Sequence, residues 1–309
     1  MVLEGLKGRF YLFCAFTFAG TSVISAKFVS DKIGTFTITT VSLFFALIVL
    51  LPLCYKGMIK TIKLMSSWDF ILLCLQALFG IFLFRMFLLK GLLFTSAGEA
   101  GIVTGTTPAI TATLAHFLLK EPVSKKSMIG ILSTVAGIFL IQGLLVSGDL
   151  LTIKHLLGNI LVICAASSES IFNIICRASV IKNISLEREP MDIITQTTIV
   201  SAVALLMCLI PTFFEHPILS LSAIVFKEVL ALFWYGVFVT ALAFIFWYAG
   251  IKRCGGCTAA AFSGMMPFTS LVLSLVILGE HIVWFQWLGG VLVILGMVLI
   301  GSNGETGKK

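Results

Sequence analysis

Glu169 has the surroundings that most clearly favour chemistry. It stands in the polar segment Ser167–Ser170, inside an otherwise apolar run, and Asn173 follows one helical turn later on the same face. An apolar environment disfavours a charged carboxylate, so this group can exchange a proton near neutral pH. It can equally bind an ammonium group of a substrate, or serve packing as a protonated side chain bonded to Asn or Ser. We expect a functional role.

Arg85 and Glu99 are two further ionisable residues within apolar runs. They lie on either side of a predicted turn near Leu92, each roughly seven residues away, which puts them at similar depth. We expect them to pair across the hairpin, with Arg85 engaging a substrate carboxylate or phosphate and Glu99 as its resting partner. The alternatives are a static salt bridge or an arginine that snorkels outward.

Two prolines interrupt apolar runs, and hydroxyl side chains flank both. Pro108 follows Thr107, and Pro267 lies near Ser263. A proline in a helix frees the carbonyl one turn earlier, which a substrate or a hydroxyl can use. A kink that serves helix packing alone is equally compatible with the pattern.

The motifs of other chemistries are missing from the sequence. It contains no HExxH, no GxSxG, no aspartate pair at depth and no GxxxxGK[ST] nucleotide loop. Cys254 and Cys257 form a CxxC without a Cys or His cluster nearby. We therefore expect no catalytic residues, no metal and no cofactor, and a protein that is not an enzyme.

The elements that carry these residues are predicted to be transmembrane helices. Of the 309 residues, 59% are hydrophobic and only 11% charged, against roughly 25% charged in soluble domains. Apolar runs long enough to cross a bilayer number about ten. They cover residues 8–29, 34–55, 69–91, 96–119, 126–145, 156–180, 192–214, 229–250, 258–278 and 284–301.

The loop charges predict the orientation of these spans. If the N-terminus is cytoplasmic, most Lys and Arg residues fall in cytoplasmic segments, as in Lys56–Lys63 and Lys120–Lys126. Both termini are thus predicted inside. The net charge of +7 lies in these short segments and forms no basic face, which argues against a nucleic-acid partner.

An internal repeat divides the chain. Residues 91–142 align without a gap on 250–301, and glycine and proline are prominent among the identical positions. The matches include Gly91 with Gly250, Gly105 with Gly264, Pro108 with Pro267, Glu121 with Glu280, Gly130 with Gly289 and Gly137 with Gly296. We predict two five-helix repeats, 8–145 and 156–301. Because five is odd, the second repeat is inverted, which is typical of secondary transporters.

Three motifs carry a family resemblance. The small-residue segment Thr95–Ala100 leading to Pro108, the apolar runs ending in Glu121 and Glu280, and the spaced glycines of spans five and ten resemble the EamA type of the drug/metabolite transporter superfamily. The resemblance implies a central path lined by spans 1, 3, 4, 6, 8 and 9. It adds as secondary lining candidates Thr21, Gln76, Trp234 and Tyr235.

Some of the repeated residues are expected to be structural. Glu121 and Glu280 each precede a predicted span, where the helix dipole stabilises an anion. The spaced glycines favour close helix packing, within the subunit or in a possible homodimer.

These observations predict a multi-pass protein of the plasma membrane, the bacterial inner membrane in particular. Its predicted function is secondary transport, namely the export of a small metabolite such as an amino acid, with a proton gradient or passive flow as the alternative drivers. One alternative is a flippase for lipid-linked substrates or an intramembrane enzyme. Another is a nucleotide-sugar or phosphate-ester exchanger, which would need more basic residues at depth than Arg85 alone.

Overall fold

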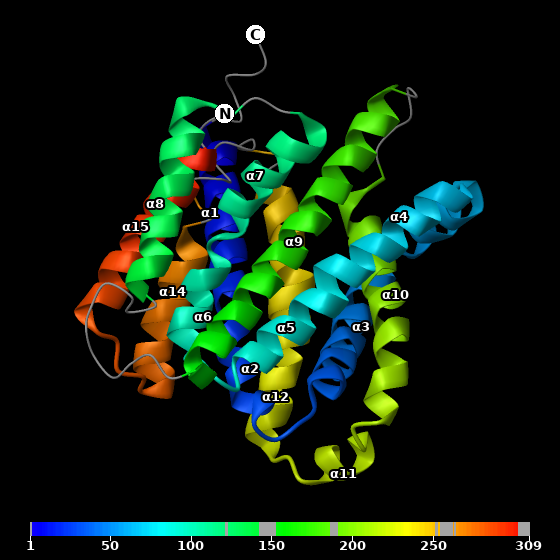
Figure 1. The fold of residues 1–309 in the computed structure, drawn as a ribbon. Coiled ribbons are helices and arrows are strands. Elements are labelled where there is room, and N and C mark those ends of the chain that lie inside the picture. Colours follow the sequence, from blue (N-terminus) through cyan, green and yellow to red (C-terminus); the bar gives the residue numbers. More distant parts are fainter. Residues whose placement is uncertain are drawn as a thin grey trace.

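The protein is all-helical in a computed structural model, which describes residues 2–120, 123–141, 153–185, 191–250, 253, 262 and 264–301 (Figure 1). These residues contain helices and no strands. The first half has α1 (Val2–Gly20), α2 (Ser22–Ser30), α3 (Thr35–Leu64), α4 (Ser67–Ala77), η1 (Leu78–Leu83), α5 (Phe84–Gly91), α6 (Ala97–Thr104), α7 (Thr107–Leu119) and α8 (Lys125–Ile141). The second half has α9 (Ile153–Ser185), α10 (Ile193–Phe213), α11 (Pro217–Ser222), α12 (Phe226–Trp234), η2 (Tyr235–Leu242), α14 (Met265–Leu273), η3 (Ser274–Leu278) and α15 (Trp284–Gly301).

The helices have the length and composition of membrane spans. Within the described residues, seven are long and apolar enough to cross a bilayer, and Met265–Leu278 and Trp284–Ile300 are shorter apolar helices. Large apolar side chains lie exposed on the outside of the bundle, for example Leu132 on α8 and Val291 on α15. Such exposure suits lipid and not water. The prediction of a multi-span membrane protein is confirmed, while the count of ten spans and their orientation stay predictions.

Several spans are interrupted instead of continuous. The fourth predicted span breaks into α6 and α7 at Gly105, so Pro108 stands in the first turn of α7, where a missing N–H costs little. The third and eighth each contain a π-helical segment, η1 and η2. π-helical turns are frequent at functional sites because they redirect side chains.

Glycine pairs join the two halves along α8 and α15, which run side by side (Figure 1). A Cβ atom added to Gly130 would lie 2.8 Å from the carbonyl oxygen of Gly296, and one added to Gly137 would lie 2.7 Å from that of Gly289. Each glycine thus faces the repeat mate of the other. Of the two packing arrangements left open by the sequence, the structure shows the one within the subunit.

The Glu280 carboxylate binds a helix N-terminus that is distant in sequence. Glu280 accepts hydrogen bonds from the backbone N–H groups of Ala97 and Gly98 at 2.8 and 2.9 Å, at the start of α6. It therefore stabilises a helix of the other half, and not the helix that follows it as expected. The structural role predicted for Glu280 agrees with this geometry, whereas Glu121 lies outside the described residues.

The long helix α9 crosses the bundle and positions the central polar residues. It packs against α5, α7, η1, α6 and α4 (Figure 1). At Gly80 the backbone leaves room for the Phe172 ring, and at Gly91 for the backbone of Gly158. This antiparallel contact brings Arg85 of α5 to a depth similar to that of Glu169 on α9.

Candidate functional site

Glu169 projects from the middle of α9 toward α7 and has few partners. Its Oε2 atom lies 2.9 Å from Oγ1 of Thr107, and this is the hydrogen bond that the described residues give it. The side chain keeps partial exposure, in contrast to its buried neighbours Ser168 and Ser170. A carboxyl group with one hydroxyl partner has free capacity for a ligand or a proton.

Thr107 connects Glu169 to the break in the fourth span. Its Oγ1 atom lies 2.9 Å from the carbonyl oxygen of Thr104, the last residue of α6. The Thr107 carbonyl accepts a bond from Ser170 Oγ at 3.1 Å. The structure thus brings together three of the predicted site residues, Glu169, Thr107 and Pro108, on α7 and α9.

Asn173 lies one turn beyond Glu169 along α9, as the spacing predicts. Its Nδ2 atom is 3.5 Å from Oγ1 of Thr111 on α7, at the limit of a hydrogen bond. Both side chains are partly exposed. They continue the polar strip between α7 and α9.

Arg85 is buried, with 5% exposure, and it is surrounded by neutral groups. Its Nη1 and Nη2 atoms donate to Oγ of Ser42 at 2.7 Å and to Oγ1 of Thr240 at 2.6 Å. The guanidinium lies 4.4 Å from the ring centroid of Tyr235, whose buried hydroxyl has no hydrogen-bond partner among the described residues. Among the described residues no carboxylate pairs with Arg85, so its charge has no counter-ion there.

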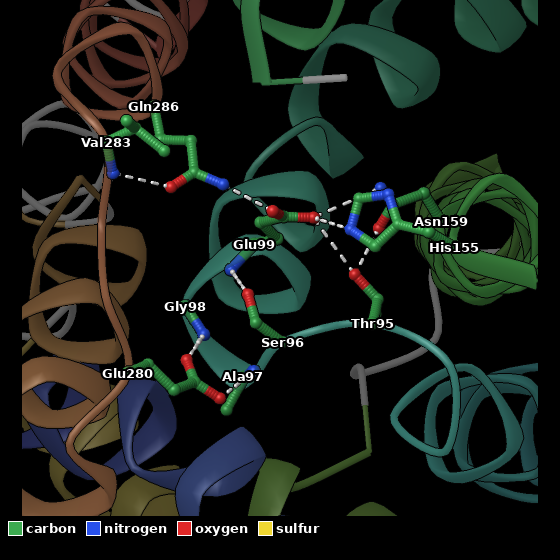
Figure 2. Close-up of polar contacts among 10 residues, drawn as sticks. All are labelled: Thr95, Ser96, Ala97, Gly98, Glu99, His155, Asn159, Glu280, Val283 and Gln286. Atoms are coloured by element: carbon green, nitrogen blue, oxygen red, sulfur yellow. Dashed lines mark hydrogen bonds and ion pairs between the residues drawn. The ribbon is translucent and has the colours of Figure 1, made fainter. Parts of the chain in front are cut away.

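Glu99, in contrast, sits in a complete hydrogen-bond network at the start of α6 (Figure 2). Its Oε2 atom receives Thr95 Oγ1 at 3.0 Å, Asn159 Nδ2 at 3.2 Å and His155 Nε2 at 2.7 Å. Its Oε1 atom accepts from Gln286 at the start of α15. The expected pairing of Arg85 with Glu99 is therefore wrong. Arg85 bonds to residues of α3 and η2, and Glu99 bonds mainly to residues of α9 and α15.

The remaining predicted residues lie away from Glu169 or outside the described residues. Thr21 accepts a hydrogen bond from the Trp234 indole at 2.8 Å, at the break between α1 and α2, and Trp234 stacks on Phe238. Gln76 is buried and accepts from Gln196 at 2.6 Å. Pro267 is buried in α14. Ser263 lies outside the described residues.

Sequence reasoning missed the partners of the charged residues. His155 and Asn159 are spaced by four at the start of α9, a polar pair on one helical face that signals a shared contact. Ser42 and Thr240 give no comparable signal, because single hydroxyl residues are common in membrane helices.

Comparison with known proteins identifies the family. The model of the EamA-like transporter family matches residues 6–143 and again residues 156–302. The chain belongs to the EamA-like transporter family. This EamA-like transporter is 30% identical over 286 residues to the uncharacterized transporter YetK of Bacillus subtilis (strain 168), covering 93% of this chain and 84% of that protein. The uncharacterized transporter YyaM of the same organism is 29% identical, covering 71% and 69%.

The fold of the EamA-like transporter also matches a solved structure. A crystal structure whose title names no function superposes with a TM-score of 0.63 at 18% identity, covering 94% of this chain and 95% of that one. This likeness shows the fold alone. Family, relatives and apolar helices together make the protein a multi-pass membrane transporter of the plasma membrane.

Proposed function

We propose that this EamA-like transporter is a secondary carrier that exports a small zwitterionic metabolite, with an amino acid as the leading candidate. Glu169 carries the proposal: it is a carboxyl group in the middle of a span, partly exposed, with one hydroxyl partner. Ionisable groups at such depth are costly and therefore point to function. Glu169 would bind the ammonium group of the substrate, a proton, or each in turn.

Arg85 supplies the opposite charge at similar depth. Desolvating a cation costs several kcal/mol unless an anion or strong acceptors compensate it. Two hydroxyl groups and an aromatic ring compensate Arg85 only in part, so a substrate carboxylate would complete the site. The unused hydroxyl of Tyr235 offers that carboxylate a further donor.

Alternating access would follow from the division into two inverted repeats. The crossed glycine pairs of α8 and α15, one helix from each repeat, support this division. Because the glycines of α8 and α15 place no long side chains between these helices, the two repeats would be able to rock against each other. The phosphate-ester alternative ranks lower, since Arg85 is the one fully buried cation among the described residues. A flippase would instead require transport of lipid-linked substrates.

Proteoliposomes test the proposal. Uptake of radiolabelled amino acids would be measured with and without an imposed pH gradient for the wild type, Glu169→Gln and the control Glu215→Gln. Glu215 is also a carboxylate, but it binds the start of α3 through Phe36 and Thr37. We expect gradient-driven accumulation by the wild type and the control, and only equilibration by Glu169→Gln.

Other outcomes would contradict parts of the proposal. Equal behaviour of the wild type and Glu169→Gln would make Glu169 structural and remove proton coupling through it. Transport of amines or carboxylates alone, but not of zwitterions, would assign only one of the two charged residues to the substrate. Absence of any amino-acid flux would overturn the substrate class.

A further inference from the structure

Two carboxylates, Glu99 and Glu280, lie at the start of α6 and connect it to different elements (Figure 2). Glu99, on α6 itself, bonds to residues of α9 and α15. Glu280, which follows η3, accepts hydrogen bonds from the backbone N–H groups of Ala97 and Gly98, one on each of its two oxygens. The end of the ninth predicted span is therefore joined to α6 through Glu280 and not through Glu99.

The π-helical segment η3, which precedes Glu280, has little contact with the rest of the bundle. Ser274 is its one fully buried residue, and residues 275–277 are exposed. Ser274 lies against α6, where a Cβ atom added to Gly98 would be 2.6 Å from the Ser274 hydroxyl oxygen. An element that buries so few side chains is held weakly, so it can move without disrupting the core.

The contact between α6 and the ninth predicted span consists of small residues. Gly98 faces Ser274, and Gly101 faces Ser270 one turn away on α14. Because glycine and serine leave no long side chains interlocked, these surfaces can separate without rotamer changes. The Ser270 hydroxyl also lies 2.7 Å from the carbonyl oxygen of Gly20 on α1. α14 is thus anchored at Ser270, whereas η3 beyond it is held by the Ser274 contact and Glu280.

This contact closes the face of the protein opposite the N-terminus. Three candidate spans precede α6, namely Gly5–Ser30, Thr35–Tyr55 and Ser67–Gly91, so α6 starts at that face, which is external in the predicted orientation. Residues Ala97–Val103 are buried there. A carrier that works by alternating access must open each face in turn, so a contact that closes one face has to break and form again.

The Glu280 contact is suited to breaking and forming again. The residue is partly exposed, and its partners are backbone N–H groups at a helix start. When the face opens, water can hydrate both the carboxylate and the N–H groups, so the net cost is far smaller than that of leaving them buried without partners. The contact can therefore hold η3 in place and still be released.

We propose that Glu280 is a gating residue, which holds η3 on the start of α6 and so closes the external face. Its release lets η3 turn away from α6 about the anchor at Ser270. The Glu99 contacts keep α6 on α9 and α15 in both positions. This inference rests on the proposed carrier function and adds a residue that controls access to the site from one face.

Cysteine labelling tests the proposal. Ser274→Cys changes one atom and places a thiol in the contact between η3 and α6. A membrane-impermeant maleimide is added to intact cells, and the labelling of the native cysteines is subtracted with a protein that lacks this substitution. Labelling of Ser274→Cys should be slow, because the contact is closed.

The decisive comparison adds Glu280→Gln to this reporter. Glutamine has one acceptor oxygen where two N–H donors meet, so at least one charge-assisted hydrogen bond is lost and labelling should become at least about tenfold faster. The same reaction in inverted membrane vesicles should show no such increase. An unchanged rate in cells, or an equal increase from both faces, would overturn the proposal.

Two further variants separate gating from general weakening. Glu215→Gln is the matched control, because Glu215 binds the start of another helix, α3, and should leave the labelling rate unchanged. An increase equal to that of Glu280→Gln would contradict the proposal. Glu280→Asp keeps the charge but shortens the side chain, so labelling should be faster than with Glu280. No increase would overturn the proposal even if Glu280→Gln failed to fold. Labelling needs no substrate, so failure of the amino-acid assignment leaves these results interpretable.

Discussion

Glu99 and Glu169 are two carboxyl groups within the helices of one molecule, and their surroundings differ in kind. Glu99 has four partners, one from the turn before α6, two from α9 and one from α15, which use both of its oxygens (Figure 2). Among the described residues, Glu169 has one hydroxyl partner, and the residue is partly exposed. The first arrangement stabilises one fixed contact between the halves of the chain, and the second leaves capacity for a ligand. The number of filled acceptor positions therefore distinguishes the two roles, although both residues look alike in the sequence.

The largest expected effect is on stability, at Glu99. Glu99→Ala would leave His155, Asn159 and Gln286 without their common acceptor, at a cost of about 3 kcal/mol or more. Thermal denaturation followed by size-exclusion chromatography in detergent should show a marked loss of folded protein. Glu169→Ala is the matched variant and should lower stability far less. An equal loss of stability in the two variants would contradict the different roles assigned to Glu99 and Glu169.

The relation between unfilled partner positions and a ligand-binding role also applies to the cation of Arg85. Arg85→Met removes a buried charge that lacks a counter-ion and keeps much of the side-chain volume, so the folded protein should be as stable as the wild type or more stable. Transport of a carboxylate-bearing substrate should fall at least about tenfold, the loss of one charge-assisted contact. A variant that transports normally would show that Arg85 serves packing.

A smaller effect should follow from removing one partner of Glu99. Gln286→Leu takes away the donor to Oε1 and leaves three contacts on Oε2, at a cost of about 1–2 kcal/mol. The transition in the same denaturation assay should lie between those of the wild type and Glu99→Ala. Gln196→Leu removes a comparable amide pair with Gln76 elsewhere and serves as the control for general loss of a buried amide.

The sequence predicted the parts of this molecule that depend on local composition and spacing. Apolar runs predicted the membrane helices, and matched glycines predicted close packing of spans five and ten. The sequence left open whether a hydroxyl, a substrate or packing alone explains the pattern at Pro108, and the structure shows the Thr107 hydroxyl bonded to the Thr104 carbonyl. Most partners of Arg85 and Glu99 were not predicted, because they come from helices distant in sequence whose rotation depends on packing. The π-helical segments η1 and η2 likewise have no sequence signature in apolar runs.

The crossed glycines of α8 and α15 have a consequence for how the sequence can diverge. At Gly130 and Gly137 the space next to the Cα atom is filled by backbone of the other half, and the same holds in reverse at Gly289 and Gly296. A methyl group at any one of the four meets a carbonyl oxygen, and no side-chain change in the opposite helix can make room for it. Neighbours that face lipid, such as Leu132, are free to vary. The two copies of an ancient duplication would thus drift apart almost everywhere while sharing these four positions.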